Sequence, residues 1–277
     1  MSTVTGAVQQ SLRDVGRASK AASKLGQQLI TGKKVDSAQD GPSAWLESSR
    51  AQSTAGLLDA IHTGLNELAT NISVAGTAMQ AIGKLLTTMQ GQIEHAQKYP
   101  AGDPTRQALI SGANGTRQQI DDIVYTTTPA GARDLMADPA QDSSAGAIQA
   151  LVGVNGEVKV VRGQQVDVGQ NGLNISLVPV NASDAQLQAA LQNLDSAQTT
   201  LDARSNGLGA DATDISRYIS QSSSTLTLYE GESESLTGVD ETEAALELQS
   251  VNMQQSLAVQ SLVSISSSRN AILNLLH

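Results

Sequence analysis

Residues 58–96 read LDAIHTGLNELATNISVAGTAMQAIGKLLTTMQGQIEHA, and this stretch decides the fold. Apolar residues recur in it at alternating steps of three and four, without a failure, at twelve consecutive positions. These positions are Leu58, Ile61, Leu65, Leu68, Ile72, Ala75, Met79, Ile82, Leu86, Met89, Ile93 and Ala96. Such a repeat is typical of a coiled-coil seam rather than of an ordinary surface helix. At ~1.5 Å per residue the predicted helix is roughly 57 Å long, far beyond the average of globular proteins.

A second seam of the same kind spans residues 184–230, after a capping-box pattern at Ser183–Gln186. Its apolar positions are Leu187, Leu191, Leu194, Leu201, Leu208, Ala212, Ile215, Ile219, Leu226 and Tyr229. Because its length matches that of the first helix, we expect the two to pair along their whole length. Two prolines and a glycine between Tyr99 and Pro104 end the first helix, and a shorter helix over 105–125 runs back.

The hydrophobic period changes between residues 129 and 182. Apolar and polar residues alternate from Val152 to Leu177, with interruptions at Asn155-Gly156 and Asn171-Gly172. Asn-Gly between alternating runs is a strong signal for a hairpin. We therefore expect a small central β-element of two to four strands. The fold class is mainly α: an elongated antiparallel helical coiled-coil bundle, its N- and C-terminal halves paired, with a small central β-hairpin element.

Both ends of the chain are predicted to be apolar helices. The first covers residues 3–31 and stops at Gly32, and the last covers 239–277. The last helix is apolar on more than one face, so it is expected to need neighbours on most sides. Residues 1–35 carry six basic side chains and one acidic, whereas 230–250 carry seven acidic and no basic ones. Such complementarity would help to orient the two ends, although a solvated charge run is the alternative.

Composition excludes several classes of function. The formal net charge of −10 argues against nucleic-acid binding, and the absence of Cys excludes disulfides and thiolate chemistry. An ordinary secretory leader and a membrane-spanning apolar run are both absent from the sequence. His62, His95 and His277 lack metal-ligand spacing, and the carboxylate pairs lie on predicted solvated helix faces. We therefore expect no catalytic residue, no cofactor and no metal site, and predict that the protein is not an enzyme.

Three stretches at the two ends of the chain carry the clearest motifs. Residues 19–40 read SKAASKLGQQLITGKKVDSAQD, a leucine-bearing helix that runs into a Gly-Lys-Lys connector. Residues 243–262 read EAALELQSVNMQQSLAVQSL, and residues 272–276 read ILNLL. The first stretch resembles the N-terminal signature of bacterial flagellins, and the other two resemble the C-terminal signature of the same family. The resemblance implies a subunit that polymerises helically into the filament that propels swimming bacteria.

The resemblance also implies a division of the chain. Residues 1–32 and 239–277 would form an inner tube, and 33–44 and 231–238 would be a spoke and a linker. Residues 45–128 and 183–230 would be rod-domain helices, and 129–182 the β-hairpin element of that rod. The residues expected to carry assembly are Val4, Val8, Leu12, Val15, Leu25, Leu29, Leu248, Val251, Leu257, Leu262, Ile265, Ile272 and Leu276.

Partners and location follow from the same resemblance. The expected partners are many copies of the chain or closely related flagellins, the flagellar type III export apparatus with its chaperone, and hook-associated junction and cap proteins. Neither nucleic acid nor membrane is expected, and the expected location is the secreted, extracellular filament. The nearest alternative is a hook–filament junction protein, which shares terminal helices and export route. A type III translocator would need a membrane-insertable run, and an enzyme would need an inserted hydrolytic domain.

Overall fold

The computed structural model describes residues 2–275, with side chains over residues 8–268. Its elements in chain order are α1 (Ser2–Thr31), α2 (Pro42–Ala96), α3 (Pro104–Asp122), a π-helix η1 (Ile123–Thr127), α4 (Ala130–Asp134), β1 (Ala147–Leu151), β2 (Val158–Arg162), α5 (Asp184–Thr237) and α6 (Glu241–Leu275). The chain forms two compact units, one of residues 56–226 and one of 1–55 with 227–277. The mainly helical fold class is confirmed.

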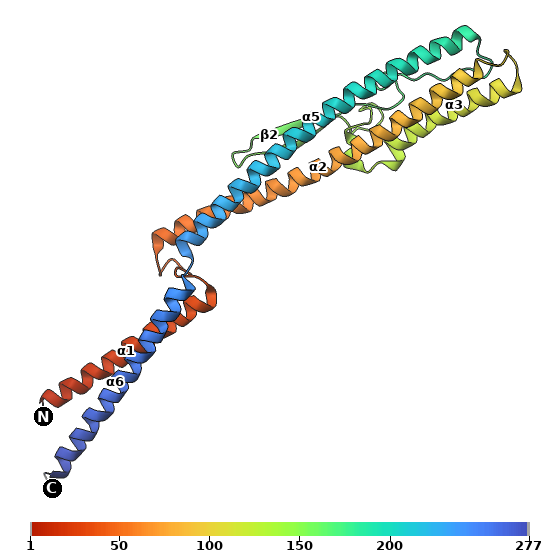
Figure 1. Ribbon diagram of the computed structural model, residues 1–277. Coiled ribbons are helices and arrows are strands. Elements are labelled where there is room, and N and C mark those ends of the chain that lie inside the picture. Colours follow the sequence, from red (N-terminus) through yellow and green to blue (C-terminus); the bar gives the residue numbers. More distant parts are fainter. Residues whose placement is uncertain (1, 276–277) are drawn as a thin grey trace. The chain divides into compact units, whose positions relative to one another are not determined.

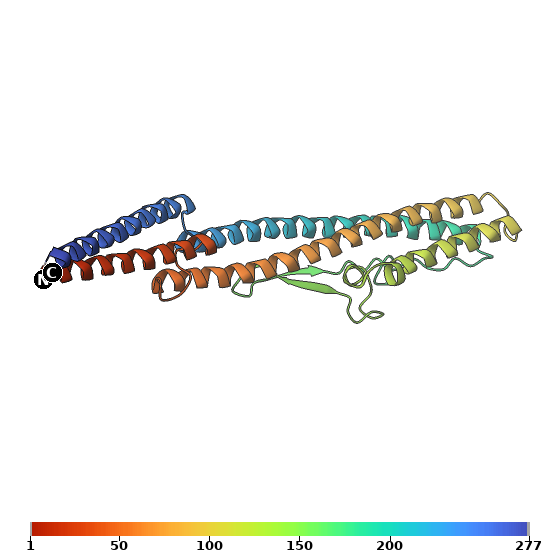
Figure 2. The same ribbon diagram turned by 90° about the horizontal axis from the view of Figure 1, so that it is seen from below.

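The unit of residues 56–226 is built on the predicted seam. All twelve seam residues of α2 are buried, with exposed fractions between 0 and 6%. Within this unit α2 and α5 run antiparallel and side by side (Figures 1 and 2). At one end Gln97 Nε2 donates to Gln188 Oε1 at 3.4 Å, and at the other the Ser222 hydroxyl donates to the Leu58 carbonyl at 3.3 Å. The predicted antiparallel pairing is therefore confirmed in this unit.

Helix α3 begins where the sequence predicts a return helix. Gly102 adopts a φ of +88° in the turn, and the Asp103 carboxylate accepts the Thr105 backbone N–H at 2.7 Å. Pro104 occupies the first helical turn, where its missing N–H costs nothing. The buried face of α3 comprises Arg106, Ile110, Ala113, Thr116 and Ile120. This face closes the core of the unit against α2.

The predicted hairpin forms around Asn155-Gly156. Strands β1 and β2 pair antiparallel, with Ala147 opposite Arg162 and Leu151 opposite Val158. Gly156 has a φ of +90°, a conformation that favours glycine. Lys159 anchors the hairpin to α5, because its Nζ lies 3.1 Å from Asp211 Oδ1 and 2.8 Å from Asp214 Oδ2.

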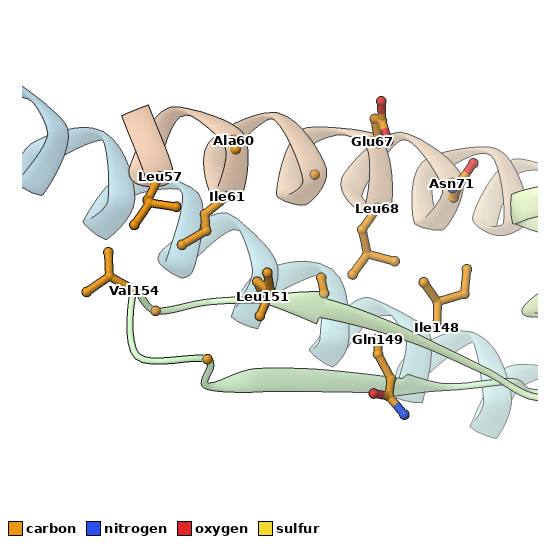
Figure 3. A pocket seen from close by; sticks show the side chains of 14 residues that line it. Leu57, Ala60, Ile61, Glu67, Leu68, Asn71, Ile148, Gln149, Leu151 and Val154 are labelled. Atoms are coloured by element: carbon orange, nitrogen blue, oxygen red, sulfur yellow. The ribbon is translucent and has the colours of Figure 1, made fainter. Parts of the chain in front are cut away.

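An open apolar groove of about 470 Å³ lies between this hairpin and α2 (Figure 3). Its labelled lining includes Leu57, Ile61 and Leu68 from α2 and Leu151 and Val154 from the hairpin. Leu57 and Leu151 remain about half exposed. The hairpin thus covers this part of α2 only in part.

The second alternating run, over residues 166–178, forms no strand, so the lower end of the predicted strand number is correct. Its buried residues are Val166, Asp167, Val168, Leu173, Ile175 and Val178. The backbone of this run pairs with side chains of α3 instead of with a strand. Arg117 Nε donates to the Ile175 carbonyl at 2.7 Å, and the Asn114 amide both donates to and accepts from Val178. The alternation of apolar and polar residues in this run therefore comes from an extended segment that packs on α3.

The predicted end of the second long helix is wrong. Helix α5 continues through residues 231–237, so the expected linker over 231–238 is reduced to residues 238–240. Ser233 and Thr237 are buried on one face of this extension, and the Ser48 and Ser233 hydroxyls lie 2.9 Å apart. The acidic residues of this extension, Glu232 and Glu234, are exposed, so the helix continues without burying charge.

A buried cation that sequence patterns did not reveal ties the ends of three helices together. Arg106 of α3 is 1% exposed. Its guanidinium donates to the Tyr99 carbonyl at 2.8 Å, to the Ala182 carbonyl at 2.6 Å and to the Asp184 carboxylate at 2.6 Å. These contacts join the end of α2, the start of α3 and the start of α5.

Arg106→Ala is expected to destabilise the 56–226 unit by about 2–5 kcal/mol, because it leaves a cavity and two buried carbonyls without donors. Chemical denaturation followed by circular dichroism measures this. The matched control is Arg162→Ala, which removes an exposed arginine and should change stability by less than about 0.5 kcal/mol. Equal effects of the two substitutions would show that the buried contacts do not stabilise the unit.

A buried carboxylate gives the same unit a pH dependence. Asp167 is 1% exposed, and its Oδ1 has no hydrogen-bond partner among the described residues. Burial raises the pKa of Asp167; the neighbouring carboxylates of Asp138 and Asp121 raise it further, whereas the Gly169 N–H lowers it. Because folding raises the pKa of Asp167, the folded unit is more stable when this carboxyl is protonated. Its contribution to the stability of the unit is therefore fully present at low pH, and it is lost as the pH rises through the folded pKa.

Asp167→Asn is therefore expected to stabilise the unit near pH 7, by on the order of 1 kcal/mol. The charge-dependent part of this gain should shrink as the pH falls through the raised folded pKa, and should vanish below about 3, where the wild-type carboxyl is protonated in both states. Thermal melts at several pH values measure this. A gain that is constant with pH would show that the carboxylate charge is not its cause.

The terminal helix pair as a candidate assembly surface

Helices α1 and α6 pack on each other in the other unit (Figures 1 and 2). They run antiparallel, since the Val239 N–H before α6 donates to the Gly32 carbonyl at the end of α1 at 3.0 Å. Each helix turns one row of residues towards its partner, which we call the inner stripe. On α6 it comprises Ala244, Leu248, Val251, Gln255, Ala258, Leu262 and Ile265, and on α1 it includes Val8, Val15, Leu25 and Leu29. These side chains are buried or half-buried.

The structure divides the residues expected to carry assembly into two groups. Eight lie on the inner stripe, with side chains that are partly or fully covered: Val8, Val15, Leu25, Leu29, Leu248, Val251, Leu262 and Ile265. Leu12 and Leu257 do not face the partner helix and are exposed. The side chains of Val4 and Ile272 and the whole of Leu276 lie outside the described residues.

Helix α6 carries a second apolar row, the outer stripe, formed by Leu246, Met253 and Leu257. These residues are spaced by seven and four, so they share one helix face. All three are exposed, Leu246 by 63% and Leu257 by 61%. On α1, Leu12 and Ile30 are also exposed, and their spacing of five helical turns places them on one face. Each helix of the pair therefore buries one apolar face against its partner and leaves other apolar residues exposed.

A clasp formed by residues 32–41 and 237–239 holds the two helices at one end. Gly32 ends α1 with a φ of +68°, and Lys33 forms an antiparallel bridge with Gly238. The Lys34 N–H donates to the Thr237 carbonyl at 2.7 Å. The sequence predicted an ordered connector after Gly32, but not its pairing with residues 237–239. The only signal was a glycine at each end of the clasp, Gly32 and Gly238.

Asp40 stabilises the clasp. The Ser37 hydroxyl donates to its carboxylate at 2.8 Å, and Lys24 Nζ lies 3.7 Å from it. The Ser37 hydroxyl, together with Lys24, lowers the pKa of Asp40. A lowered pKa means that the charged carboxylate stabilises the clasp above its ordinary pKa, and that this contribution is lost as the pH falls through the folded pKa.

The charge complementarity between the two ends of the chain is not used within the chain. Among the side chains that the structure describes, the basic residues of 1–35 form no ion pair with the acidic residues of 230–250. Arg17 pairs instead with Asp14 at 2.8 Å, and Lys24 with Asp40. The expectation that these charges pair to orient the two ends is therefore wrong at the level of direct contacts.

His62 and His95 occupy ordinary helix positions, whereas His277 lies outside the described residues. His62 contacts Asn66 one turn away, and His95 packs edge-on against Tyr99, with 5.7 Å between ring centroids. Over the described residues, no cluster of three or more histidine or carboxylate side chains is arranged to bind a metal ion. None of the described helices combines the length and hydropathy that a membrane span requires.

Comparison with known proteins identifies the family. Residues 4–138 match the bacterial flagellin N-terminal helical region. Flagellins FljM and FljO of Caulobacter vibrioides are each 23% identical to the chain over 264 residues, which covers 95% of this chain and 94% of each relative. A crystal structure of Bacillus cereus flagellin superposes with a TM-score of 0.48 at 14% identity, over 58% of this chain and 88% of that one. The chain belongs to the bacterial flagellin family.

Proposed function

We propose that this chain is a structural subunit that polymerises helically into a bacterial flagellar filament. The observation that supports this most is the outer stripe. Helices α1 and α6 already cover each other, yet Leu246, Met253 and Leu257 remain exposed on α6. Exposed apolar rows of this kind mark surfaces that bind other protein chains. Members of the flagellin family are structural proteins. In a filament of many identical copies, neighbouring copies would cover the exposed outer stripe.

The energetics of the helix pair favour assembly over isolation. Burying one Leu, Ile or Met side chain contributes about 1.5–3 kcal/mol, so the five exposed residues Leu12, Ile30, Leu246, Met253 and Leu257 represent roughly 8–15 kcal/mol for each subunit. Immobilising the subunit and its side chains offsets part of this. A two-helix pair is marginal in water by itself, because its stability comes from packing rather than from helix propensity. Covering the outer stripe would therefore stabilise filament and helix pair together.

The finer parts of the proposal rest on family membership. We propose export through the flagellar type III apparatus with a dedicated chaperone, and contacts with hook-associated junction and cap proteins at the filament ends. Flagellin homologues form the extracellular filament, which is the location that we propose for this chain. Residues 1–32 and 239–277 are assigned to the inner tube, and residues 45–230 to the surrounding rod.

Seeded elongation tests the function and separates it from a hook–filament junction role. Purified chain is added to short filament seeds, and lengths are measured by electron microscopy at increasing ratios of chain to seed. We expect length to rise in proportion to the chain added, as for a filament subunit. A short stub that stops growing at every ratio would instead indicate a junction protein and contradict the proposal.

A further inference from the structure

We infer that one copy of this chain docks on the next through two oppositely charged patches near the clasp. The basic patch consists of Lys24, Lys33 and Lys34, with the exposed Ile30 in the last turn of α1. The acidic patch consists of Glu241, Glu243 and Glu247 with the exposed Leu246 in α6, and of Glu230, Glu232 and Glu234 towards the end of α5. This inference rests on the proposed function, and it names the partner of each patch as a second copy of the same chain.

The basic patch is an exposed surface. Ile30 is 86% exposed on the last turn of α1, and Lys33 and Lys34 follow directly and are exposed as well. Lys24, Lys33 and Lys34 line a shallow polar depression of about 320 Å³, together with two acids, Asp36 and Asp40. The Asp40 carboxylate is already engaged, because it accepts the Ser37 hydroxyl and lies 3.7 Å from Lys24 Nζ. Lys33 and Lys34 have no ionic partner among the described residues.

The acidic patch has the matching form. Leu246 is 63% exposed, and Glu243 and Glu247 lie three residues before it and one after it, both exposed. Asp240 is occupied, because its carboxylate accepts the N–H groups of Thr242 and Glu243 at 2.9 and 3.0 Å. None of the six glutamates forms an ion pair among the described side chains.

Helix electrostatics explain only two of these acids. Carboxylates stabilise the first turn of a helix, which accounts for Glu241 and Glu243 in α6. The same effect disfavours carboxylates in the last turn of a helix, and Glu234 lies in the last turn of α5, which has no basic residue. Cations of a neighbouring copy that face these acids would offset that cost.

The two patches have the composition of an interface. Each combines an exposed apolar residue, Ile30 or Leu246, with exposed charges that are mainly of one sign; in an interface a buried apolar centre contributes affinity and the charges contribute register. Because each copy carries one patch of each sign, the contact joins unlike surfaces. When the two patches of one copy contact two different neighbours, such head-to-tail contacts repeat from copy to copy into rings or open filaments; if both contacted the same neighbour, the two copies would close as a twofold dimer. The contact thus agrees with helical polymerisation.

Charge reversal tests this contact between copies. The first variant carries Lys33→Glu and Lys34→Glu, and the second carries Glu243→Lys and Glu247→Lys. In each variant alone, like charges meet at every contact, so the minimum concentration for seeded elongation at about 0.15 M salt should rise at least about tenfold. In an equimolar mixture the reversed basic patch of the first variant can face the reversed acidic patch of the second, and the two native patches can face each other, so unlike charges meet again. Elongation should then return to within about threefold of wild type.

The controls separate the contact from net charge and from folding. Glu67→Lys with Glu94→Lys makes the same charge change as the second variant at exposed positions of α2, and should alter elongation less than about twofold. Circular dichroism checks that all variants keep the wild-type helicity. The inference is wrong if the single variants elongate normally, if the α2 control is equally impaired, or if the mixture fails to recover.

A second readout separates this inference from the proposed function. Sedimentation of the two variants, alone and mixed, is measured without seeds and below the concentration for elongation. If the variants associate preferentially in the mixture but the wild-type chain does not elongate, the contact is supported and only the filament role is contradicted. If the wild-type chain elongates but the mixture shows neither recovered elongation nor association, only the contact is contradicted.

Discussion

Removal of residues 258–277 is expected to abolish polymerisation while leaving residues 56–226 folded. The truncation deletes Ala258, Leu262 and Ile265 from the inner stripe, so much of α1 loses its partner helix. The 56–226 unit has its own core, centred on the twelve seam residues of α2, and contains none of the deleted residues. Electron microscopy and sedimentation measure assembly, and the thermal melt of helicity measures the remaining unit.

A full-length control separates loss of pairing from loss of chain length. Leu262→Gln with Ile265→Gln keeps every residue but places polar groups on the inner stripe, and should also block elongation. Ser264→Ala with Ser267→Ala, at exposed positions of the same turns, should not. Filaments formed by the truncated chain would refute the assignment of the terminal helices to assembly.

Leu86→Asp is expected to unfold the 56–226 unit at physiological temperature. Leu86 is fully buried in the centre of the seam, so the substitution places a carboxylate in the core without a partner and leaves a cavity. The two effects together are expected to cost more than about 4 kcal/mol, a large share of the stability of a single domain. Denaturant titration followed by circular dichroism measures the loss.

The matched control lies on the same helix, just outside the seam. Leu57 is 56% exposed, so Leu57→Asp should cost less than about 1 kcal/mol. The two substitutions make the same chemical change at positions that differ in burial. Similar losses of stability at Leu57 and Leu86 would show that the seam is not the core of this unit.

The sequence predicts those parts of the fold that repeat. Each seam residue of α2 follows the same spacing, and burial matches the pattern at every one of the twelve positions. The inner stripe of α6 follows for the same reason, because Leu248, Val251, Ala258, Leu262 and Ile265 share one helical period. Periodicity identifies an apolar face of a helix but not what covers it. The sequence therefore predicts one assembly surface that includes both Leu12 and Leu257, which are exposed, and residues that face the partner helix.

Other parts depend on single long-range contacts, which leave no period in the sequence. The clasp is made by backbone groups of Gly32, Lys34 and Val239 with residues far along the chain. The buried Arg106 satisfies carbonyls 7 and 76 residues away. The continuation of α5 past Glu230 depends on Ser233 meeting Ser48, whereas the acidic composition alone suggested a linker.

The central claim is that other copies of the chain cover the outer stripe of α6, and thiol labelling tests it most directly. The chain contains no Cys, so Leu257→Cys and Ser143→Cys each introduce a single reactive site. Both positions are exposed in the subunit, Leu257 on the outer stripe and Ser143 in the loop before β1. Rates of reaction with a soluble maleimide are compared between free chain and assembled filament. We predict that labelling at position 257 slows by an order of magnitude or more on assembly while labelling at 143 does not change. Equal labelling of position 257 in both states would contradict the claim.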